Sequence, residues 1–422
     1  MMSYDLERPQ GLLGHMLAFE GVTDAVTIVH GPTGCKQYPA DLSEKSFRSR
    51  DGQYTVRNLF SFEEKYYFFQ PRIPCTYLDG DTFVSGASER LQDLYGLVVS
   101  KKPGLIGVIN SPGASLIGED LTRLSSDIPT SVCESPGFSH SLSDGFQDAT
   151  LEIIRTLCKE GTSTKKGICI FGMGIWQYRW EDSLREIKRI LGLCGIEVIA
   201  AVCAGSTAEE MSGIPSSELN IVIHPEHGER AASYCKERFG TDYVCGLPFG
   251  FDSAEEWIRE VCDRLHKDPS PALEDIQYWR RRSATFISRL DASFIHLSGN
   301  TFSIDGDGSL VDRISEFLYS YIGMVPVAIS SPDAGKAEEV RRRFLDRGIP
   351  VEDSVWDTDA DVCLASGNTV SSLKSRGVIF DGVDISEPSR MHMSITGEPL
   401  IGTLGTVTVL QKVLDIIARI VK

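Results

Sequence analysis

The feature that most constrains the fold is a repeated alternation of short apolar runs with longer amphipathic segments. Residues 25–29 and 105–109 are typical of the runs, and residues 180–193 are typical of the segments between them. Strands that alternate with helices form right-handed βαβ units and mostly parallel sheets. The sequence therefore predicts an α/β fold. Further runs are 167–171, 197–202, 219–223, 293–297, 325–329, 362–365 and 377–380, and further helical segments are 228–239, 253–265, 335–347 and 406–420.

Chain length and two polar breaks predict several domains. The chain has 422 residues, more than one ordinary domain holds. A polar segment at 159–166 precedes a buried run, and the segment 266–282 combines Asp268-Pro-Ser-Pro271 with a charged helix. We expect three Rossmann-like domains with mostly parallel sheets, at 1–160, 161–268 and 269–422.

Charge and hydropathy exclude two classes of partner. The formal net charge is −17, from 59 acidic and 42 basic residues, which argues against non-specific binding to nucleic acid or anionic lipid. No run approaches the roughly 18 apolar residues of a membrane span. The first residues, 1–14, lack the layout of a secretory signal. We expect a cytoplasmic protein without a nucleic-acid or membrane partner.

The chain has eleven cysteines, and no two of them form a CxxC pair. This pattern fits neither a secreted disulfide framework nor the compact ligand runs of ferredoxins and zinc ribbons. A metal cluster would need ligands from distant segments or from another subunit. We expect Cys133 to be structural. Small core residues are expected at Cys194, Cys203, Cys245 and Cys262, which lie in apolar patterns.

One loop combines a tight turn with a cysteine. The apolar run 25–29 continues into His30-Gly-Pro-Thr-Gly-Cys35, where Gly31 and Gly34 allow a turn at the carboxyl end of a strand, the usual place for ligands in open α/β sheets. A helix N-terminus after the turn would favour the thiolate of Cys35, and thiolate is the form that binds iron. Judged from these residues alone, a buried structural cysteine fits equally well.

The segment His30–Cys35 resembles the HGPxGC element of the nitrogenase component 1 family. The resemblance continues in order along nearly the whole chain and is most specific over residues 25–145. It implies the component 1 fold, with a first domain that binds a cluster and forms the dimer interface, and a third domain that closes a substrate or cofactor cleft. Further similar elements begin at Asp81-Thr-Phe-Val-Ser-Gly, Ser111-Pro-Gly-Ala-Ser-Leu-Ile-Gly, Val132-Cys-Glu-Ser-Pro-Gly-Phe, Leu219-Asn-Ile-Val-Ile-His224 and Ser389-Arg-Met-His392.

The resemblance implies that Cys35 ligates a cluster at a subunit interface. Cys75, in Pro71-Arg-Ile-Pro-Cys75, resembles a PxxC segment of family β subunits and is either a second ligand or a packed loop cysteine. Two cysteines per chain in a symmetric dimer would supply the four thiolates of one [4Fe–4S] cluster. An eight-iron cluster is not expected, because no cysteine lies near Pro9 and Ser111 stands where the family has its third cysteine.

The family's cofactor pocket is changed in this chain. His224 stands where nitrogenase has its cofactor cysteine, His227 follows three residues on, and His392 corresponds to the cofactor histidine. Loss of the cysteine argues against the large molybdenum cofactor and against dinitrogen reduction. We expect His224 and His392 to be catalytic, orienting or protonating an organic substrate. The alternative is that they are surface or hydrogen-bonded histidines.

No GxxxxGK[ST] phosphate loop occurs in the chain, so ATP hydrolysis is assigned, by resemblance, to a separate iron–sulfur reductase. As a homodimer, or as a heterodimer or tetramer with a related subunit, the chain would accept low-potential electrons and reduce a small organic molecule. The implied substrate is a tetrapyrrole or a cofactor precursor, as in the dark protochlorophyllide reductases and the nickel-tetrapyrrole reductive cyclase. The alternatives are a non-catalytic scaffold that assembles and transfers a larger metallocluster, and a cluster-binding sensor.

Overall fold

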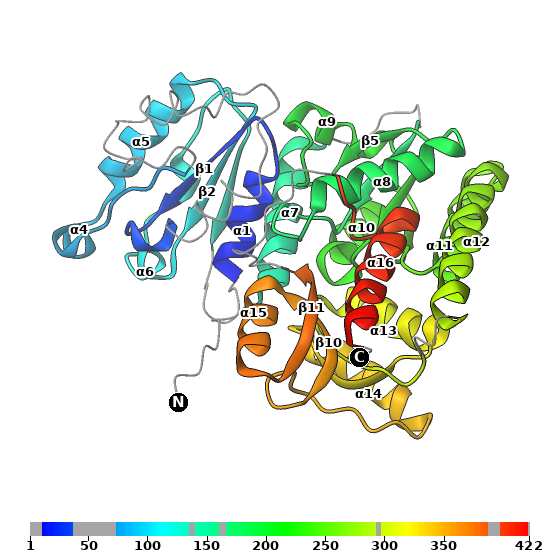
Figure 1. The fold of residues 1–422 in the computed structure, drawn as a ribbon. Coiled ribbons are helices and arrows are strands. Elements are labelled where there is room, and N and C mark those ends of the chain that lie inside the picture. Colours follow the sequence, from blue (N-terminus) through cyan, green and yellow to red (C-terminus); the bar gives the residue numbers. More distant parts are fainter. Residues whose placement is uncertain are drawn as a thin grey trace. The chain divides into compact units, whose positions relative to one another are not determined.

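The computed structural model describes residues 11–36, 73–134, 140–159, 166–292, 297–386 and 397–420. The chain divides into two compact units. The first unit comprises Met1–Trp176, Val198–Ile221 and His227–Tyr243, and the second comprises Gln177–Glu197, Val222–Glu226 and Val244–Lys422. The described residues form three sheets separated by helices, and this confirms the predicted α/β class (Figure 1).

The first sheet has the order β1-β2-β3, with parallel pairing throughout. Its strands are β1 (Ala25–His30), β2 (Leu105–Asn110) and β3 (Thr130–Glu134). Every residue of β2 is buried, which explains its unbroken apolar sequence, because a central parallel strand is covered on both faces. The sequence did not predict β3, whose residues alternate between half-buried and buried.

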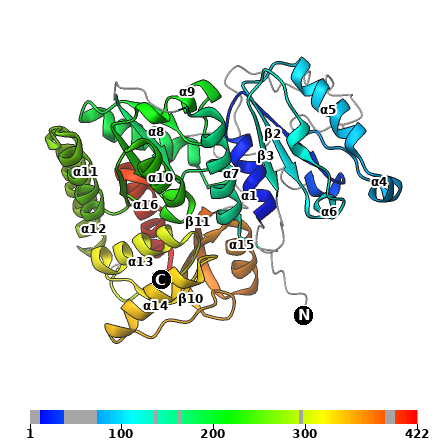
Figure 2. The same cartoon turned by 180° about the vertical axis from the view of Figure 1, so that it is seen from behind.

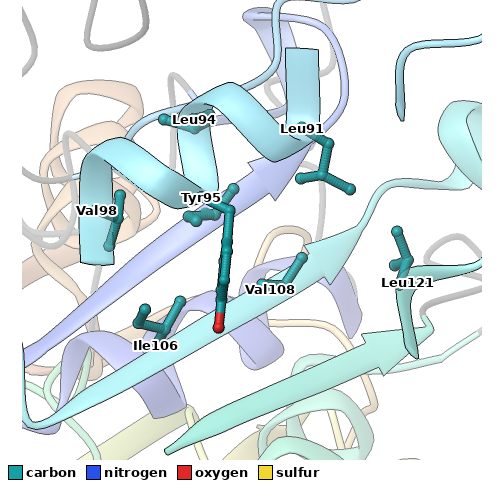
Figure 3. Close-up of a cluster of buried hydrophobic side chains, with 8 residues drawn as sticks. Leu91, Leu94, Tyr95, Val98, Ile106, Val108 and Leu121 are labelled. Atoms are coloured by element: carbon teal, nitrogen blue, oxygen red, sulfur yellow. The ribbon is translucent and has the colours of Figure 1, made fainter. Parts of the chain in front are cut away.

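Helices cover both faces of this sheet. Helix α5 (Ser88–Ser100) packs Leu91, Leu94, Tyr95 and Val98 against strand residues that include Ile28, Ile106 and Val108 (Figure 3). Helix α1 (Gly11–Glu20) lies on the other face, where a Cβ at Gly107 would collide with the ring of Phe19. Helix α7 (Leu142–Leu157) packs on α1. Shorter helices in this part are α4 (Gly80–Ser85), α6 (Pro112–Ser115) and the 3-10 turn η2 (Leu121–Arg123).

The second sheet has the order β5-β4-β6-β7. Its predicted strands at 167–171, 197–202 and 219–223 are confirmed to within one residue at each end, while the short β7 was not predicted. The elements are β4 (Ile168–Phe171), β5 (Val198–Ala201), α9 (Ala208–Ser212), η3 (Ile214–Ser216), β6 (Leu219–Val222), α10 (Pro225–Phe239) and β7 (Tyr243–Cys245).

The third sheet lies in the second unit and has the order β11-β10-β8-β9, again with parallel pairs (Figure 2). Val370 and Leu373 of helix α15 pack on its buried side chains, among them Cys363. The run predicted at 293–297 lies mostly outside the described residues, and the strand in this region is β8. The elements are β8 (Thr301–Asp305), α13 (Gly308–Ile322), β9 (Val325–Ser330), α14 (Ala334–Asp346), β10 (Ala360–Ser366), α15 (Gly367–Arg376) and β11 (Ile379–Ser386).

Long helices complete the second unit. The predicted span of α8 (Trp180–Leu193) is confirmed, and the charged helix expected near residue 280 is α12 (Ser270–Ala292). The other two are α11 (Phe251–Leu265) and α16 (Gly402–Ile420). None of the helices in the described parts of the chain is long and apolar enough to cross a bilayer. The division into three domains stays a prediction.

Candidate metal centre

The structure brings the two candidate ligand segments together at the carboxyl end of β1. Val29 and Cys75 form an isolated parallel bridge. The Val29 amide donates to the Pro74 carbonyl oxygen at 3.0 Å, and the Thr76 amide donates to the Val29 carbonyl oxygen at 3.1 Å. Cys75 therefore lies beside the end of the strand from which the Cys35 turn departs.

The turn after β1 is held close to the loop after β2. The Ser111 amide donates to the His30 carbonyl oxygen at 2.9 Å, and a Cβ at Gly31 would collide with the Ser111 side chain. Glycine is therefore required at 31 by a close approach. Gly34, by contrast, is exposed with open space around it, and it begins a short helical stretch that continues through Cys35 and Lys36.

The two thiols interact with each other and with the same turn. Burial raises the pKa of the half-buried Cys35 thiol, a hydrogen bond with Ser111 opposes this, and the nearby Cys75 thiol adds to the rise. Burial likewise raises the pKa of the Cys75 thiol, against the opposing influence of the Lys36 ammonium and a hydrogen bond with Thr33. The expectation that a helix N-terminus would favour the Cys35 thiolate is not met, because burial outweighs the helix dipole.

A buried hydrogen-bond network supports both segments. The His30 ring places Nδ1 3.0 Å from the Thr76 hydroxyl and Nε2 2.8 Å from the Glu119 carboxylate. The Thr76 hydroxyl also accepts from the Gly31 amide at 2.9 Å, and Glu119 accepts from the Ala87 amide at the start of α5. Burial lowers the pKa of His30, while Glu119 works in the opposite direction. Sequence reasoning missed Thr76 and Glu119, whose partners are distant in the chain.

The donor set of this site suits iron held jointly with another chain. Two neighbouring thiols are the soft ligands that iron–sulfur clusters use, and a cluster of four irons takes four of them. Within the described parts of the chain, no group of three or more His, Cys, Asp or Glu residues is placed to hold a metal ion. Cys35 and Cys75 therefore fit half of a four-thiolate set.

The histidines predicted to be catalytic have different surroundings. His224 is buried at the end of β6, and its Nδ1 lies 2.7 Å from the hydroxyl of Ser309 near the start of α13. The same hydroxyl donates to Glu226 at 2.8 Å. His227 is buried, and its ring meets that of Trp176 edge-on at a centroid distance of 5.2 Å. His392 lies outside the described residues. The catalytic roles of His224 and His392 stay predictions.

The remaining cysteines follow the expected pattern with one exception. Cys133 is buried in β3, where desolvation raises its pKa. Burial raises the pKa of Cys203 to about 12, and Cys194 and Cys262 are buried as well. The prediction for Cys245 was wrong: it is exposed, because β7 lies at the edge of its sheet and only its middle residue is buried.

Comparisons with curated proteins give relatives of one kind, a subunit of the light-independent protochlorophyllide reductase. The chain is 26% identical over 246 residues to this protein from Synechococcus sp. (strain CC9605), covering 55% of this chain and 45% of the relative. It is 25% identical over 342 residues to the corresponding protein from Roseobacter denitrificans (strain ATCC 33942 / OCh 114), covering 80% of this chain and 62% of the relative. The chain thus spans roughly half of the length of the relatives it matches.

Solved structures and a family profile agree on the fold. The structure titled "Nitrogenase Cp1 at pH 6.5" matches with a TM-score of 0.80 and 15% identity, covering 98% of this chain and 93% of that one. A second structure, "Nitrogenase Cp1 at pH 5", matches with a TM-score of 0.73 and 18% identity, covering 98% and 88%. The profile described as "Nitrogenase component 1 type Oxidoreductase" matches residues 11–417. With that match extending over nearly all of its residues, the chain belongs to the nitrogenase component 1 type oxidoreductase family.

Proposed function

We propose that this chain is a nitrogenase-like reductase subunit that takes low-potential electrons from an ATP-dependent iron–sulfur reductase, through a [4Fe–4S] cluster, and reduces a bound organic molecule. The observation that carries the proposal is the meeting of the Cys35 and Cys75 thiols at the carboxyl end of β1. Family membership and relatives named for protochlorophyllide reduction support the reductive activity.

In this proposal the cluster, when bound, stores and passes single electrons. Cys35 and Cys75 are its ligands from this chain, and a paired subunit, either a second copy or a related chain, supplies the other two thiolates. Gly31 allows the turn to approach Ser111 closely, and the His30–Thr76 hydrogen bond keeps the Cys75 segment against that turn.

The proposed substrate is a tetrapyrrole or a related cofactor precursor. Reduction in single-electron steps needs protons, and a histidine ring can both donate and regain one. Ser309 fixes Nδ1 of His224 and so sets the orientation of the ring, which suits a proton donor. We retain His224 and His392 as the proposed catalytic residues, and we expect no reduction of dinitrogen or acetylene, because the cofactor cysteine is replaced by His224.

Close to the proposed ligands, the chain exposes a group of large apolar side chains. Val84 in α4 is 91% exposed and Leu116, directly after α6, is 82% exposed, with Tyr77 and Phe83 exposed nearby in sequence. Helix α4 extends from the edge of the first unit (Figure 1). Apolar groups so exposed mark interaction sites. We assign them to docking of the electron-donating reductase, since electron transfer requires the donor close to the cluster.

The test is anaerobic purification with iron and sulfide analysis and EPR of the dithionite-reduced protein. Cys35→Ser and Cys75→Ala should each lose most of the bound iron and the EPR signal, while Cys245→Ser, at an exposed cysteine, should keep both. Electron transfer from a nucleotide-dependent reductase to the wild-type cluster, followed by reduction of a tetrapyrrole, completes the expected result.

Two outcomes would contradict the proposal. Wild-type iron content in Cys35→Ser would remove the cluster from this site. Recovery of a large cluster that passes to an acceptor protein, without turnover of any organic substrate, would instead assign the chain to metallocluster assembly.

A further inference from the structure

The residue after Cys35 is a lysine that is fully buried. Lys36 has a relative exposure of 0%, and its Nζ donates to the Ile73 carbonyl oxygen at 2.6 Å. Burying an ammonium group costs several kcal/mol unless other groups compensate. Lysine is among the residues least often found fully buried. A position that needed only an apolar contact or a filled volume would be better served by methionine or leucine.

The location of this ammonium gives it an electrostatic role. The Lys36 side chain reaches from the Cys35 turn to Ile73, two residues before Cys75, so it joins the two segments that carry the thiols. The Lys36 charge is the largest influence that favours the thiolate form of Cys75. Inside a protein, where the effective dielectric constant is low, a neighbouring charge acts more strongly than it does in water.

We infer that Lys36 is a positioning and tuning residue of the Cys35–Cys75 site, whose buried positive charge stabilises the bound cluster in its reduced state and so raises its reduction potential. The inference rests on the function proposed above. A thiolate-bound iron–sulfur cluster carries net negative charge, and adding one electron increases it. Net charge and hydrogen bonding around a cluster are established determinants of its potential. A fixed cation beside the ligands favours the more negative, reduced form.

The same geometry predicts opposite effects on the apoprotein and on the cluster. Without a cluster, the buried charge is costly, so the apoprotein of Lys36→Met should melt at the same temperature as wild type or higher. With a cluster, Lys36→Met should shift the midpoint potential to more negative values. A purely structural lysine, needed to hold the Ile73 carbonyl, predicts instead a lower melting temperature in the apoprotein and no specific change in potential.

The experiment compares Lys36→Met, Lys36→Arg and wild type by EPR-monitored redox titration, iron analysis and melting of the apoprotein. We expect Lys36→Arg, which keeps the charge, to stay close to wild type. We expect Lys36→Met to change the reduction equilibrium at least tenfold, which is about 59 mV for a one-electron couple. Lys101→Met, at an exposed lysine, controls for the loss of one positive charge elsewhere in the chain.

Each outcome decides the inference. An unchanged potential in Lys36→Met, or an equal shift in the Met and Arg variants, overturns it. If Lys36→Met binds no iron, Lys36→Gln repeats the neutral comparison. Iron retained by Arg alone still supports a role for the charge, and iron lost from all three variants refutes it. Cys35→Ser, measured in parallel, separates the two claims: wild-type iron there removes the cluster itself, whereas lost iron there with an unchanged potential in Lys36→Met removes only the role of Lys36.

Discussion

At the scale of single residues, the Thr76 hydroxyl joins the two segments that carry the candidate ligands. It accepts from the Gly31 amide at 2.9 Å and lies 3.0 Å from Nδ1 of His30, which pairs in turn with Glu119. Thr76 and His30 are both fully buried. Removing the hydroxyl leaves these buried polar groups without that partner, and an unsatisfied buried group costs more than the net value of the bond.

Thr76→Val, which keeps the shape of the side chain, should therefore lower the free energy of unfolding of the apoprotein by about 1–3 kcal/mol. The measurement is urea denaturation of the apoprotein. Thr150→Val is the matched control: its hydroxyl bonds to the Phe146 carbonyl within α7, so the loss should be smaller. Equal stability losses in the two variants would show that the Thr76 network has no special weight.

The sequence allowed part of this site to be predicted. Cys35 and Gly31 follow from a local pattern, because a strand, a turn and a cysteine are adjacent in the chain. Lys36, Thr76 and Glu119 were missed, since each acts on groups that only the folded chain brings near: Glu119 lies 89 positions after His30. The local apolar pattern also failed at Cys245, where burial depends on the place of β7 at the sheet edge.

At the scale of elements, the packing of α1 on α7 depends on small residues. A Cβ at Gly14 would collide with the Leu142 carbonyl oxygen, and a Cβ at Gly145 would collide with that of Gly11. The Gly11 amide donates to the His140 carbonyl oxygen at 2.8 Å, which fixes the start of α1 against the start of α7. Both glycines are therefore required by the close approach of two backbones.

Gly14→Ala should destabilise the protein by about 1–3 kcal/mol, because an added methyl group must separate the two helices. Gly96→Ala makes the same change in α5, where nothing lies within 4 Å of the added carbon. It should stabilise the protein by up to about 1 kcal/mol, since alanine is the better helix former. Thermal unfolding of the two variants measures the contrast, and a loss at Gly96 as large as that at Gly14 would contradict this account.

A second element-scale contact makes stability depend on pH. Asp312 in α13 lies 2.7 Å from Arg343 and 3.2 Å from Lys336, both in α14. Burial alone would raise the pKa of Asp312, but these two cations hold it below its usual value. A carboxyl group with a lowered pKa contributes stability in full above its unfolded pKa of about 3.9 and loses it as the pH falls through its folded value.

Asp312→Asn should therefore lower the free energy of unfolding at pH 7 by about 1–2 kcal/mol, a value between those of exposed and buried pairs. The difference from wild type should shrink as the pH falls below about 4. Urea denaturation at a series of pH values tests this, with Glu256→Gln at an exposed position of α11 as control. A difference that stays constant from pH 7 to the acid range would argue against an ionic contribution.

Elements were predictable where their burial matched their composition. Strands β2 and β9 are apolar runs, and helix α8 alternates apolar and charged residues with a helical period. β8 was missed although it is paired on both sides, because Thr301 and Ser303 give it a polar sequence. The Ser303 hydroxyl lies in contact with the Cys363 thiol of β10, a compensation between neighbouring strands that one segment of sequence does not reveal.

At the scale of the whole molecule, the exposed apolar residues near the proposed ligands should govern electron delivery. Val84→Glu places a charge on a side chain that is 91% exposed, so the fold and the bound iron should be unchanged. Electron transfer from the reductase should fall at least about tenfold, as expected when a charge is buried in an apolar contact. Leu193→Glu, at an exposed apolar residue of α8, is the control, and equal rates in the two variants would show that the reductase docks elsewhere.

The half-set of thiols makes a final prediction about assembly. If two copies of this chain meet so that each contributes Cys35 and Cys75, the holoprotein should be a dimer with about four irons, or about two per chain. Native mass spectrometry with iron analysis measures both quantities. A related partner chain would give a different result: this chain purified alone would hold almost no iron and would gain it on addition of the partner. A monomer with a full cluster, or full iron in Cys75→Ala, would contradict both arrangements, because the chain would then supply all four ligands by itself or hold the cluster without Cys75.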